Sequence, residues 1–218
     1  MEPDFWHDRW ESGRIGFHLD TVNPWLEHHW PMPGVNRGAR VFVPLCGKSF
    51  DMLWLLEQGY RVTGIEISQL AIEAFFSEHR LEAQTEPAGQ FTRWRHKGLD
   101  VLCGDFFDLD KSLLGPVDAI YDRAALIAMP PALRPRYAAQ LAGLANRDTC
   151  QLLITLDYNQ SEMSGPPFSV AGDEVNRLFG DSCSIELVES TDVLEENAKF
   201  RDSGLTSLRE QMYFLTHL

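Results

Sequence analysis

The amino-acid sequence predicts an α/β fold with a mostly parallel β-sheet and helices on both of its faces. From Val41 onward, short apolar runs alternate with segments of helical periodicity, which is the order of elements in β-α-β units. Near the end of the chain this alternation stops, because the last two strand-like runs are joined only by residues 194–206. Such a short connection favours an antiparallel finish over a crossover helix. The sequence therefore predicts a parallel sheet that ends on a reversed strand.

The individual elements follow in chain order. Strand-like runs cover residues 40–45, 61–67, 101–107, 117–122, 150–158, 184–193 and 208–218, and helical periodicity covers residues 49–60, 69–79, 130–145 and 171–179. Gly59 is placed to end the first of these helices, and Ser68 can cap the start of the second. Residues 109–116 are loop-like.

Length and charge limit the possible classes of function. The chain has 218 residues, 44% of them apolar, which is enough for a full core. We therefore expect residues 1–218 to form a single domain, or at most one domain with an extra lobe. The formal net charge is −13, and the Lys and Arg residues are scattered along the chain. Such a surface repels polyphosphate backbones, so we do not expect a nucleic-acid partner.

Cysteine usage and the apolar runs indicate the compartment. The four cysteines lie far apart, without a C-x-x-C pair, which is typical of buried thiols in a reducing compartment. The sequence contains neither a signal-peptide pattern nor an apolar run of membrane-spanning length. No heptad or long apolar stretch demands a partner chain. We therefore expect a cytoplasmic monomer that does not enter a membrane.

The turn within VFVPLCGKSFD, residues 41–51, raises the question of which ligand it holds. Its Gly47-Lys48-Ser49 is also how a P-loop ends, but a P-loop requires glycine five positions earlier, where this chain has Phe42. A dinucleotide fingerprint requires three glycines, and only Gly47 is available before Gln58. The P-loop interpretation therefore fails, and the dinucleotide interpretation is disfavoured because a pyrophosphate would be poorly bound.

Glu66 supports a nucleoside ligand without phosphates. It lies 21 residues after Leu45, at the end of the next strand-like run, where a carboxylate can accept hydrogen bonds from two ribose hydroxyls. S-adenosylmethionine is such a ligand, and it tolerates fewer glycines than a dinucleotide does. The alternative is that Glu66 is a solvated carboxylate at a strand end.

Two further strand ends carry candidate residues. Asp105 could accept a hydrogen bond from an adenine amino group while Phe106 or Phe107 covers the ring, although either aromatic side chain could belong to the core. Asp122 and Arg123 follow at the end of the next run. Arg123 is either a functional cation at the ligand edge of the sheet or a salt-bridged surface residue.

Three other features have ordinary explanations. His28 and His29 point apart on a helix and lack a third ligand with suitable spacing, so we expect no metal site. Cys46 has no assignable base, which favours a small buried thiol over a nucleophile. Gly165–Phe168, sequence GPPF, could form a wall of an acceptor pocket or an ordinary connection.

Five segments taken together resemble the thiopurine S-methyltransferase family. They are VFVPLCGKSFDM, GIEIS, FFDL, YDRAALIA and GPPF, and the likeness extends from FWHDRWESGRIGFH to MYFLTHL. It is to the short bacterial branch, which is associated with methylation of selenium and tellurium compounds and with tellurite resistance. Leu45 and Ser49 replace the outer glycines of the general methyltransferase turn, and Val43 replaces its acidic residue, but this family shares the altered turn.

The resemblance implies a class I S-adenosylmethionine-dependent methyltransferase fold, which is Rossmann-like, with a mostly parallel seven-stranded sheet and an antiparallel last strand. Residues 1–35 would form a helical cap over the cofactor and the acceptor. The implied site comprises cofactor contacts by Trp10, Leu45, Glu66 and Arg123, adenine-side positions at Asp105 and Phe106, and an acceptor contact by Phe17. Trp6 and Trp10 would share one face of an N-terminal helix able to close over the ligand, although Trp6 could instead pack that helix on the sheet.

The activity that the resemblance implies is methyl transfer from S-adenosyl-L-methionine to the sulfur of thiopurines and aromatic or heterocyclic thiols, with S-adenosyl-L-homocysteine as product. Selenium or tellurium compounds are further candidate acceptors, which would make the reaction a detoxification. Arg123 would orient the acceptor, either by attracting its negative charge or by ordering water beside it, without forming a covalent bond. The alternative is a non-catalytic nucleoside- or metalloid-binding module with the same fold.

Overall fold

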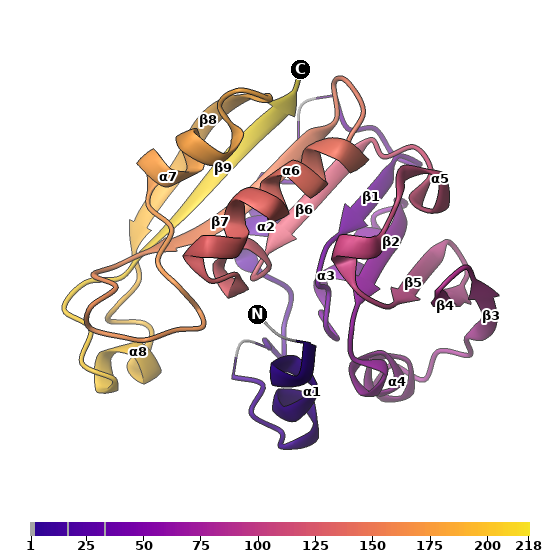
Figure 1. Cartoon of the computed structure of the whole chain (residues 1–218), viewed down its shortest axis with the longest axis horizontal. Coiled ribbons are helices and arrows are strands. Elements are labelled where there is room, and N and C mark those ends of the chain that lie inside the picture. Colours follow the sequence, from indigo (N-terminus) through magenta and orange to yellow (C-terminus); the bar gives the residue numbers. More distant parts are fainter. Residues whose placement is uncertain (1–2, 17, 33) are drawn as a thin grey trace. The chain divides into compact units, whose positions relative to one another are not determined.

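The structure is a computed structural model that describes residues 3–16, 18–32 and 34–218 (Figure 1). The chain divides into two compact units, Met1–Ile120 and Tyr121–Leu218, and the division falls inside one β-strand. The two units are described one after the other. The single domain expected over residues 1–218 stays a prediction.

Unit 1 contains the predicted parallel strands and two N-terminal helices. Its elements are α1 (Pro3–Glu11), α2 (Pro24–His29), β1 (Arg40–Val43), α3 (Asp51–Glu57), β2 (Arg61–Glu66), α4 (Gln69–Glu78), β3 (Gln84–Ala88), β4 (Phe91–His96), β5 (Leu99–Cys103), the 3-10 helix η1 (Phe106–Asp108), α5 (Lys111–Leu114) and the start of β6 (Ala119–Arg123). The strand order is β3-β4-β5-β2-β1-β6, and β5, β2, β1 and β6 run parallel. This arrangement confirms the parallel sheet.

The predicted helix signals of unit 1 are confirmed. The side-chain oxygen of Ser68 accepts a hydrogen bond from the backbone N–H of Ala71 and caps α4. Gly59 follows α3 with a φ of 90°, a conformation that glycine adopts without strain. Residues 109–116 differ from the expected loop, because Lys111–Leu114 form one helical turn that the Asp110 carboxylate caps.

A β-hairpin in unit 1 was not predicted. β3 and β4 form an antiparallel pair at the edge of this unit's sheet, and β4 pairs with β5 (Figure 1). Ala88 lies opposite Phe91, so the loop contains only Gly89 and Gln90, and Gly89 has a φ of 64°. A two-residue loop that begins with glycine is typical of tight hairpins. The side chains of β3 are mostly exposed, so the strand lacks the apolar pattern on which the sequence prediction depended.

Unit 2 contains the reversed end of the sheet. Its elements are the rest of β6, the 3-10 helices η2 (Leu126–Ala128) and η3 (Pro131–Leu133), α6 (Arg134–Leu144), β7 (Cys150–Asp157), α7 (Gly172–Phe179), β8 (Cys183–Asp192), α8 (Ala198–Asp202) and β9 (Arg209–His217). The strand order is β6-β7-β9-β8, and β9 is antiparallel to both β7 and β8. Within this unit, α6 and α7 lie on the same face of the strands (Figure 1). The antiparallel last strand is therefore confirmed.

The described residues contain nine strands, whereas the family resemblance implied seven. Seven of the nine are the strand-like runs expected from the sequence, and β3 and β4 are additions at the edge. The helix expected over residues 130–145 divides into η3 and α6. The connection between β8 and β9 contains only the five-residue helix α8, so it remains too short for a crossover.

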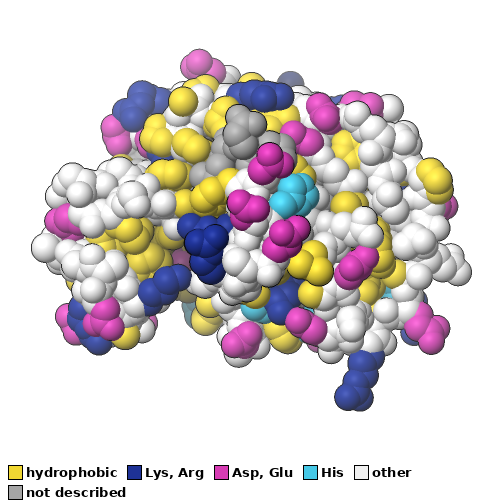
Figure 2. Space-filling view, turned by 60° about the horizontal axis from the view of Figure 1, so that its bottom comes forward, with side chains coloured by type: hydrophobic (Ala, Val, Ile, Leu, Met, Phe, Trp, Pro, Cys, Tyr) yellow, Lys and Arg dark blue, Asp and Glu magenta, His cyan; other side chains and the backbone are white. Residues whose placement is uncertain are grey.

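The surface and the helices bear on possible partners. On the face drawn in Figure 2, acidic side chains lie scattered among neutral ones, and the Lys and Arg side chains that are drawn do not gather into one continuous patch. This agrees with the net charge of −13. Within the part of the chain that the structure describes, none of the helices combines the length and the apolar character needed to cross a membrane.

Candidate functional site

The turn after β1 has an unusual backbone conformation. β1 ends at Val43, and the N–H of Cys46 then donates to the Ile65 carbonyl oxygen over 2.9 Å, which fixes the turn against β2. Leu45 has a φ of 47° and Gly47 a φ of 53°. Leu45 thus adopts a left-handed conformation, at a cost of about 1–2 kcal/mol for a residue other than glycine. Such strain often occurs where the backbone must approach a ligand closely.

Glu66 is buried, and its carboxylate binds the turn. One carboxylate oxygen accepts from the N–H of Gly47 over 2.9 Å, and the other accepts from the N–H of Ser68 over 2.8 Å. The residue is only 6% exposed, so the interpretation as a solvated carboxylate is wrong. Burial raises the pKa of Glu66 above its ordinary value, and the backbone N–H donors oppose this rise. The Ile67 backbone N–H also stabilises the carboxylate. A carboxylate has about four acceptor positions, so acceptor capacity remains for a hydroxyl donor.

The indole of Trp10 lies against the same turn. A Cβ atom built on Gly47 would lie 3.2 Å from Cζ2 of Trp10, so only glycine allows the indole to approach this closely without adjustment. Trp10 is buried, whereas Trp6, on the same helix, is half-buried and contacts Phe5 edge-to-face. Of the two tryptophans expected to share a face, Trp10 is the one that the structure places at the Gly47 turn.

Gly64 is a site residue that the sequence interpretation missed. A Cβ atom at this position would lie 2.7 Å from Sγ of Cys46 and 3.0 Å from Sδ of Met52. The missing side chain of Gly64 therefore makes room for Cys46 beneath the turn. Burial, with a smaller effect of Glu66, raises the pKa of the Cys46 thiol well above its ordinary value. This environment agrees with the prediction of a buried thiol and disfavours a nucleophile.

Gly64→Ala is expected to lower the free energy of unfolding by about 1–3 kcal/mol, because the new methyl group must displace Cys46 or the strand. Gly143→Ala is the matched control, since Gly143 is exposed in α6 and a Cβ there meets nothing within 4 Å. That control should be as stable as the parent protein or about 0.5–1 kcal/mol more stable. Urea denaturation measures both variants. If Gly64→Ala were as stable as the parent protein, the turn would not depend on this close packing.

Lys48 is occupied by an ion pair. Its Nζ donates to both carboxylate oxygens of Glu78, over 2.6 and 2.8 Å, and so joins the turn to the end of α4. This pairing agrees with the exclusion of a phosphate-binding loop.

The adenine-side candidates follow β5. Glu66 lies opposite Cys103 in the β2–β5 pair, so Asp105 comes two residues after the position level with Glu66. Oδ1 of Asp105 accepts from the N–H of Phe107 over 2.9 Å, which caps η1. The ring of Phe106 is 3% exposed and stacks on Phe42, so it belongs to the core. Only Phe107, which is half-buried, can offer a ring face to a base.

In unit 2, Arg123 is the last residue of β6 and is half-buried. Its positive charge counteracts a rise in the pKa of Glu210 that burial causes and that Glu189 and Glu196 enlarge. Glu210 pairs with Leu156 near the end of β7, because β9 runs antiparallel to β7 and its first residues therefore lie beside the last residues of β7. The sequence interpretation missed Glu210.

Asp122, next to Arg123, is fully buried. Burial raises the pKa of its carboxyl group to about 7, from an ordinary 3.8, although hydrogen bonds from the Tyr137 hydroxyl and the Leu126 N–H oppose this rise. The folded protein therefore retains a proton that the unfolded chain loses near pH 4, so this group lowers stability as the pH rises from about 4 to 7.

Asp122→Asn should remove this pH dependence. The free energy of unfolding of the variant relative to the parent protein is expected to rise between pH 4 and pH 7, by up to about 4 kcal/mol. Urea denaturation of both proteins at several pH values measures the change. A difference between the two proteins that stays constant over this range would contradict the raised pKa.

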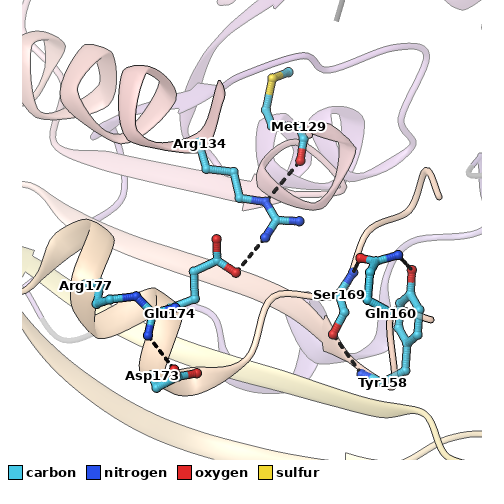
Figure 3. Close-up of polar contacts among 8 residues, drawn as sticks. All are labelled: Met129, Arg134, Tyr158, Gln160, Ser169, Asp173, Glu174 and Arg177. Atoms are coloured by element: carbon cyan, nitrogen blue, oxygen red, sulfur yellow. Dashed lines mark hydrogen bonds and ion pairs between the residues drawn. The ribbon is translucent and has the colours of Figure 1, made fainter. Parts of the chain in front are cut away.

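The loop Tyr158–Ser169, which contains GPPF, is held by internal hydrogen bonds (Figure 3). The Tyr158 hydroxyl donates to the Pro167 carbonyl oxygen over 2.6 Å. Gln160 donates to the Tyr158 hydroxyl and accepts from the N–H of Ser169, whose Oγ accepts from the N–H of Tyr158. The loop is thus an ordered structure, and its role as an acceptor wall stays a prediction.

Arg134 supports this loop from α6. It is buried, its Nε donates to the Met129 carbonyl oxygen over 3.0 Å, and its Nη1 contacts Glu174 of α7 over 2.6 Å (Figure 3). Its guanidinium carbon lies 5.9 Å from the centre of the Phe168 ring, within the range of a cation–π contact. Figure 3 also shows the neighbouring ion pair between Arg177 and Asp173 on α7.

The remaining predictions from the sequence concern Phe17, the cysteines and a metal site. Phe17, the expected acceptor contact, lies outside the described residues. All four cysteines are free thiols; Cys46 and Cys183 are buried as predicted, whereas Cys103 and Cys150 are only half-buried. Over residues 3–16, 18–32 and 34–218, the structure contains no group of three or more His, Cys, Asp or Glu side chains able to hold a metal ion. Gly47 contacts both Trp10 and Glu66 in unit 1, and Arg123 belongs to unit 2.

Comparisons with known proteins identify the family of the chain. The sequence model of the family described as thiopurine S-methyltransferase (TPMT) matches residues 1–218. The chain is 49% identical over 214 residues to a thiopurine S-methyltransferase of Pseudomonas fluorescens, covering 98% of each chain. It is 50% identical over 216 residues to that of Methylococcus capsulatus, covering 99% of this chain and 97% of the relative.

Among solved structures, the fold is similar to that of 1,6-didemethyltoxoflavin-N1-methyltransferase from Burkholderia thailandensis, determined with bound 1,6-didemethyltoxoflavin and S-adenosylhomocysteine. The TM-score is 0.65 at 17% identity, covering 99% of this chain and 87% of the other. At this identity the likeness concerns the fold, and it agrees with the predicted class I methyltransferase architecture.

Proposed function

The chain belongs to the thiopurine S-methyltransferase family, and we propose that it methylates the sulfur of small aromatic or heterocyclic thiols, thiopurines among them. Membership of this family makes it an enzyme that uses S-adenosyl-L-methionine and releases S-adenosyl-L-homocysteine. We further propose a cytoplasmic monomer that acts in detoxification, with selenium and tellurium compounds as additional acceptors.

The observation that carries this proposal is the fit of the turn in unit 1 to a nucleoside without phosphates. Gly47 has no side chain, so the Trp10 indole lies directly against the backbone of the turn. The buried Glu66 carboxylate, with acceptor capacity to spare, supplies partners for ribose hydroxyls. The one lysine of the turn, Lys48, is engaged by Glu78 rather than available to a phosphate. A dinucleotide or triphosphate would lack partners here.

Each candidate residue can make a contact with S-adenosylmethionine that fits its burial and its hydrogen bonds. Glu66 holds the ribose, Asp105 accepts from the adenine amino group through its second oxygen, and Phe106 contributes through its main chain because its ring is buried. Leu45 brings its backbone close to the cofactor through its left-handed conformation. Trp10 presents an electron-rich ring, which attracts a cation over its face.

When bound, S-adenosylmethionine supplies an electrophilic methyl group on a positively charged sulfur. An aromatic thiol is already substantially ionised near neutral pH, so the chain need not supply a strong base. Its residues instead hold the nucleophile in line with the methyl group. Because attack neutralises opposite charges, exclusion of water from the site favours the reaction. We propose that residues 1–35, which include Trp10 and Phe17, exclude this water as a helical cap.

The test is a turnover assay on purified protein with isotopically labelled S-adenosylmethionine and a panel of acceptors. 6-Mercaptopurine, thiophenol and a selenol are each expected to be methylated. For each acceptor, the amount of methylated product should equal the amount of S-adenosylhomocysteine released. Hypoxanthine, in which oxygen replaces the sulfur of 6-mercaptopurine, is the matched control and should give none. Cofactor binding without turnover on any thiol or selenol would instead favour a binding module with the same fold.

A further inference from the structure

A buried polar network lies behind the end of β6 in unit 2. The Asp122 side chain is completely buried and accepts three hydrogen bonds: from the Tyr137 hydroxyl of α6 over 2.9 Å, from Nε2 of Gln151 on β7 over 3.3 Å, and from the N–H of Leu126 over 3.3 Å. Tyr137 and Gln151 are themselves fully buried. Three elements of the unit thus converge on one carboxyl group.

The network continues to β9. The side-chain oxygen of Gln151 lies 3.1 Å from Nε2 of His217. Since the amide nitrogen of Gln151 donates to Asp122, its oxygen must accept, so His217 carries its proton on Nε2. Burial lowers the pKa of His217, which favours this neutral imidazole. Burial and the neighbouring Asp122 raise the pKa of Tyr137 well above its ordinary value, so its hydroxyl keeps the proton that it donates.

This network contains a buried carboxyl group, and it lies next to Arg123 in the chain. Burying a carboxyl group lowers stability unless hydrogen bonds compensate. The bond from Leu126 to Asp122 closes a turn of the chain that contains Arg123, and Ala124 within that turn has a φ of 62°. Neighbouring residues of a strand point to opposite faces, so fixing Asp122 on one side also fixes where Arg123 leaves the strand on the other.

We propose that the Asp122–Tyr137–Gln151 network is a positioning device for Arg123, so that Tyr137 and Gln151 govern acceptor use without touching the acceptor. The inference rests on the proposed function, because it takes Arg123 as the residue that orients the acceptor. It assigns an activity-determining role to side chains of α6 and β7 in unit 2. Asp122 accepts the hydrogen bonds of Tyr137 and Gln151. His217 holds the Gln151 amide in the orientation in which its nitrogen donates to Asp122.

The experiment is a double-mutant cycle of Tyr137→Phe and Arg123→Ala. Tyr137→Phe removes one hydroxyl and should lower kcat/KM for the thiol acceptor about tenfold, while the dissociation constant of S-adenosylhomocysteine stays within about twofold. In the Arg123→Ala background the same change should have no further effect. Tyr213→Phe is the matched control, because its buried hydroxyl donates to Gln211 over 2.9 Å outside this network. It should leave kcat/KM unchanged in both backgrounds.

An equal fall of kcat/KM in both backgrounds would overturn the inference, because Tyr137 would then act independently of Arg123. A parallel loss of S-adenosylhomocysteine affinity would also overturn it, since it would indicate a general structural defect. If Tyr137→Phe does not fold, Asp122→Asn replaces it in the same cycle with the same expected outcome. Absence of turnover in the parent protein would refute the proposed function, and this inference with it, before any variant is compared.

Discussion

Glu66→Ala is expected to weaken binding of S-adenosylhomocysteine by about 1–3 kcal/mol, because the ribose hydroxyls lose a buried charged acceptor. The variant should also unfold more easily, since the N–H groups of Gly47 and Ser68 lose the same carboxylate. Isothermal titration calorimetry measures the first effect and urea denaturation the second.

A modified ligand separates the two contributions. The parent protein should bind the 2′-deoxyribose analogue of S-adenosylhomocysteine more weakly than the natural ligand. Glu66→Ala should bind the analogue and the natural ligand with equal affinity. Glu73→Ala, which removes an exposed carboxylate from α4, is the control and should retain full affinity. If Glu66→Ala retained full affinity as well, Glu66 would have no role in holding the ribose.

Arg123→Ala is expected to lower kcat/KM for an anionic thiol acceptor by about 10–100-fold, because the thiolate loses the cation that orients it. Arg123→Lys keeps the charge but loses the planar arrangement of donors, so it should restore only part of the activity. Steady-state kinetics with 6-mercaptopurine above its pKa measure both variants. Arg147→Ala, an exposed arginine after α6, is the control and should leave turnover unchanged. Unchanged turnover and unchanged acceptor affinity in both Arg123 variants would refute the orienting role.

The site in unit 1 could be predicted from the sequence to a large extent because its signals are local. The break after Val43, the single glycine at position 47 and the acidic residue at the end of the next strand can all be recognised along the chain. The partners of Glu66 could not be predicted, because the bond to Gly47 joins residues 19 positions apart and depends on how the turn folds back. Gly64 was missed for the same reason, since its role appears only through the sulfur atom of Cys46.

Other features of the structure could not be predicted because they depend on tertiary packing. The sequence could not distinguish Phe106 from Phe107, because the burial of Phe106 depends on stacking with Phe42 from another strand. The β3–β4 hairpin escaped prediction because polar edge strands lack an apolar period. Glu210 lies beside the end of β7 only through the antiparallel register of β9 with β7, and the sequence predicts the direction of that strand but not its register.

The most direct measurement is a crystal structure of the protein with bound S-adenosylhomocysteine. We expect the ribose hydroxyls to lie within hydrogen-bonding distance of the Glu66 carboxylate, with the rest of the ligand against the Leu45–Gly47 turn and the Trp10 indole. A ligand bound elsewhere, or a ribose without contact to Glu66, would show that this turn is not the binding site of the methyl donor.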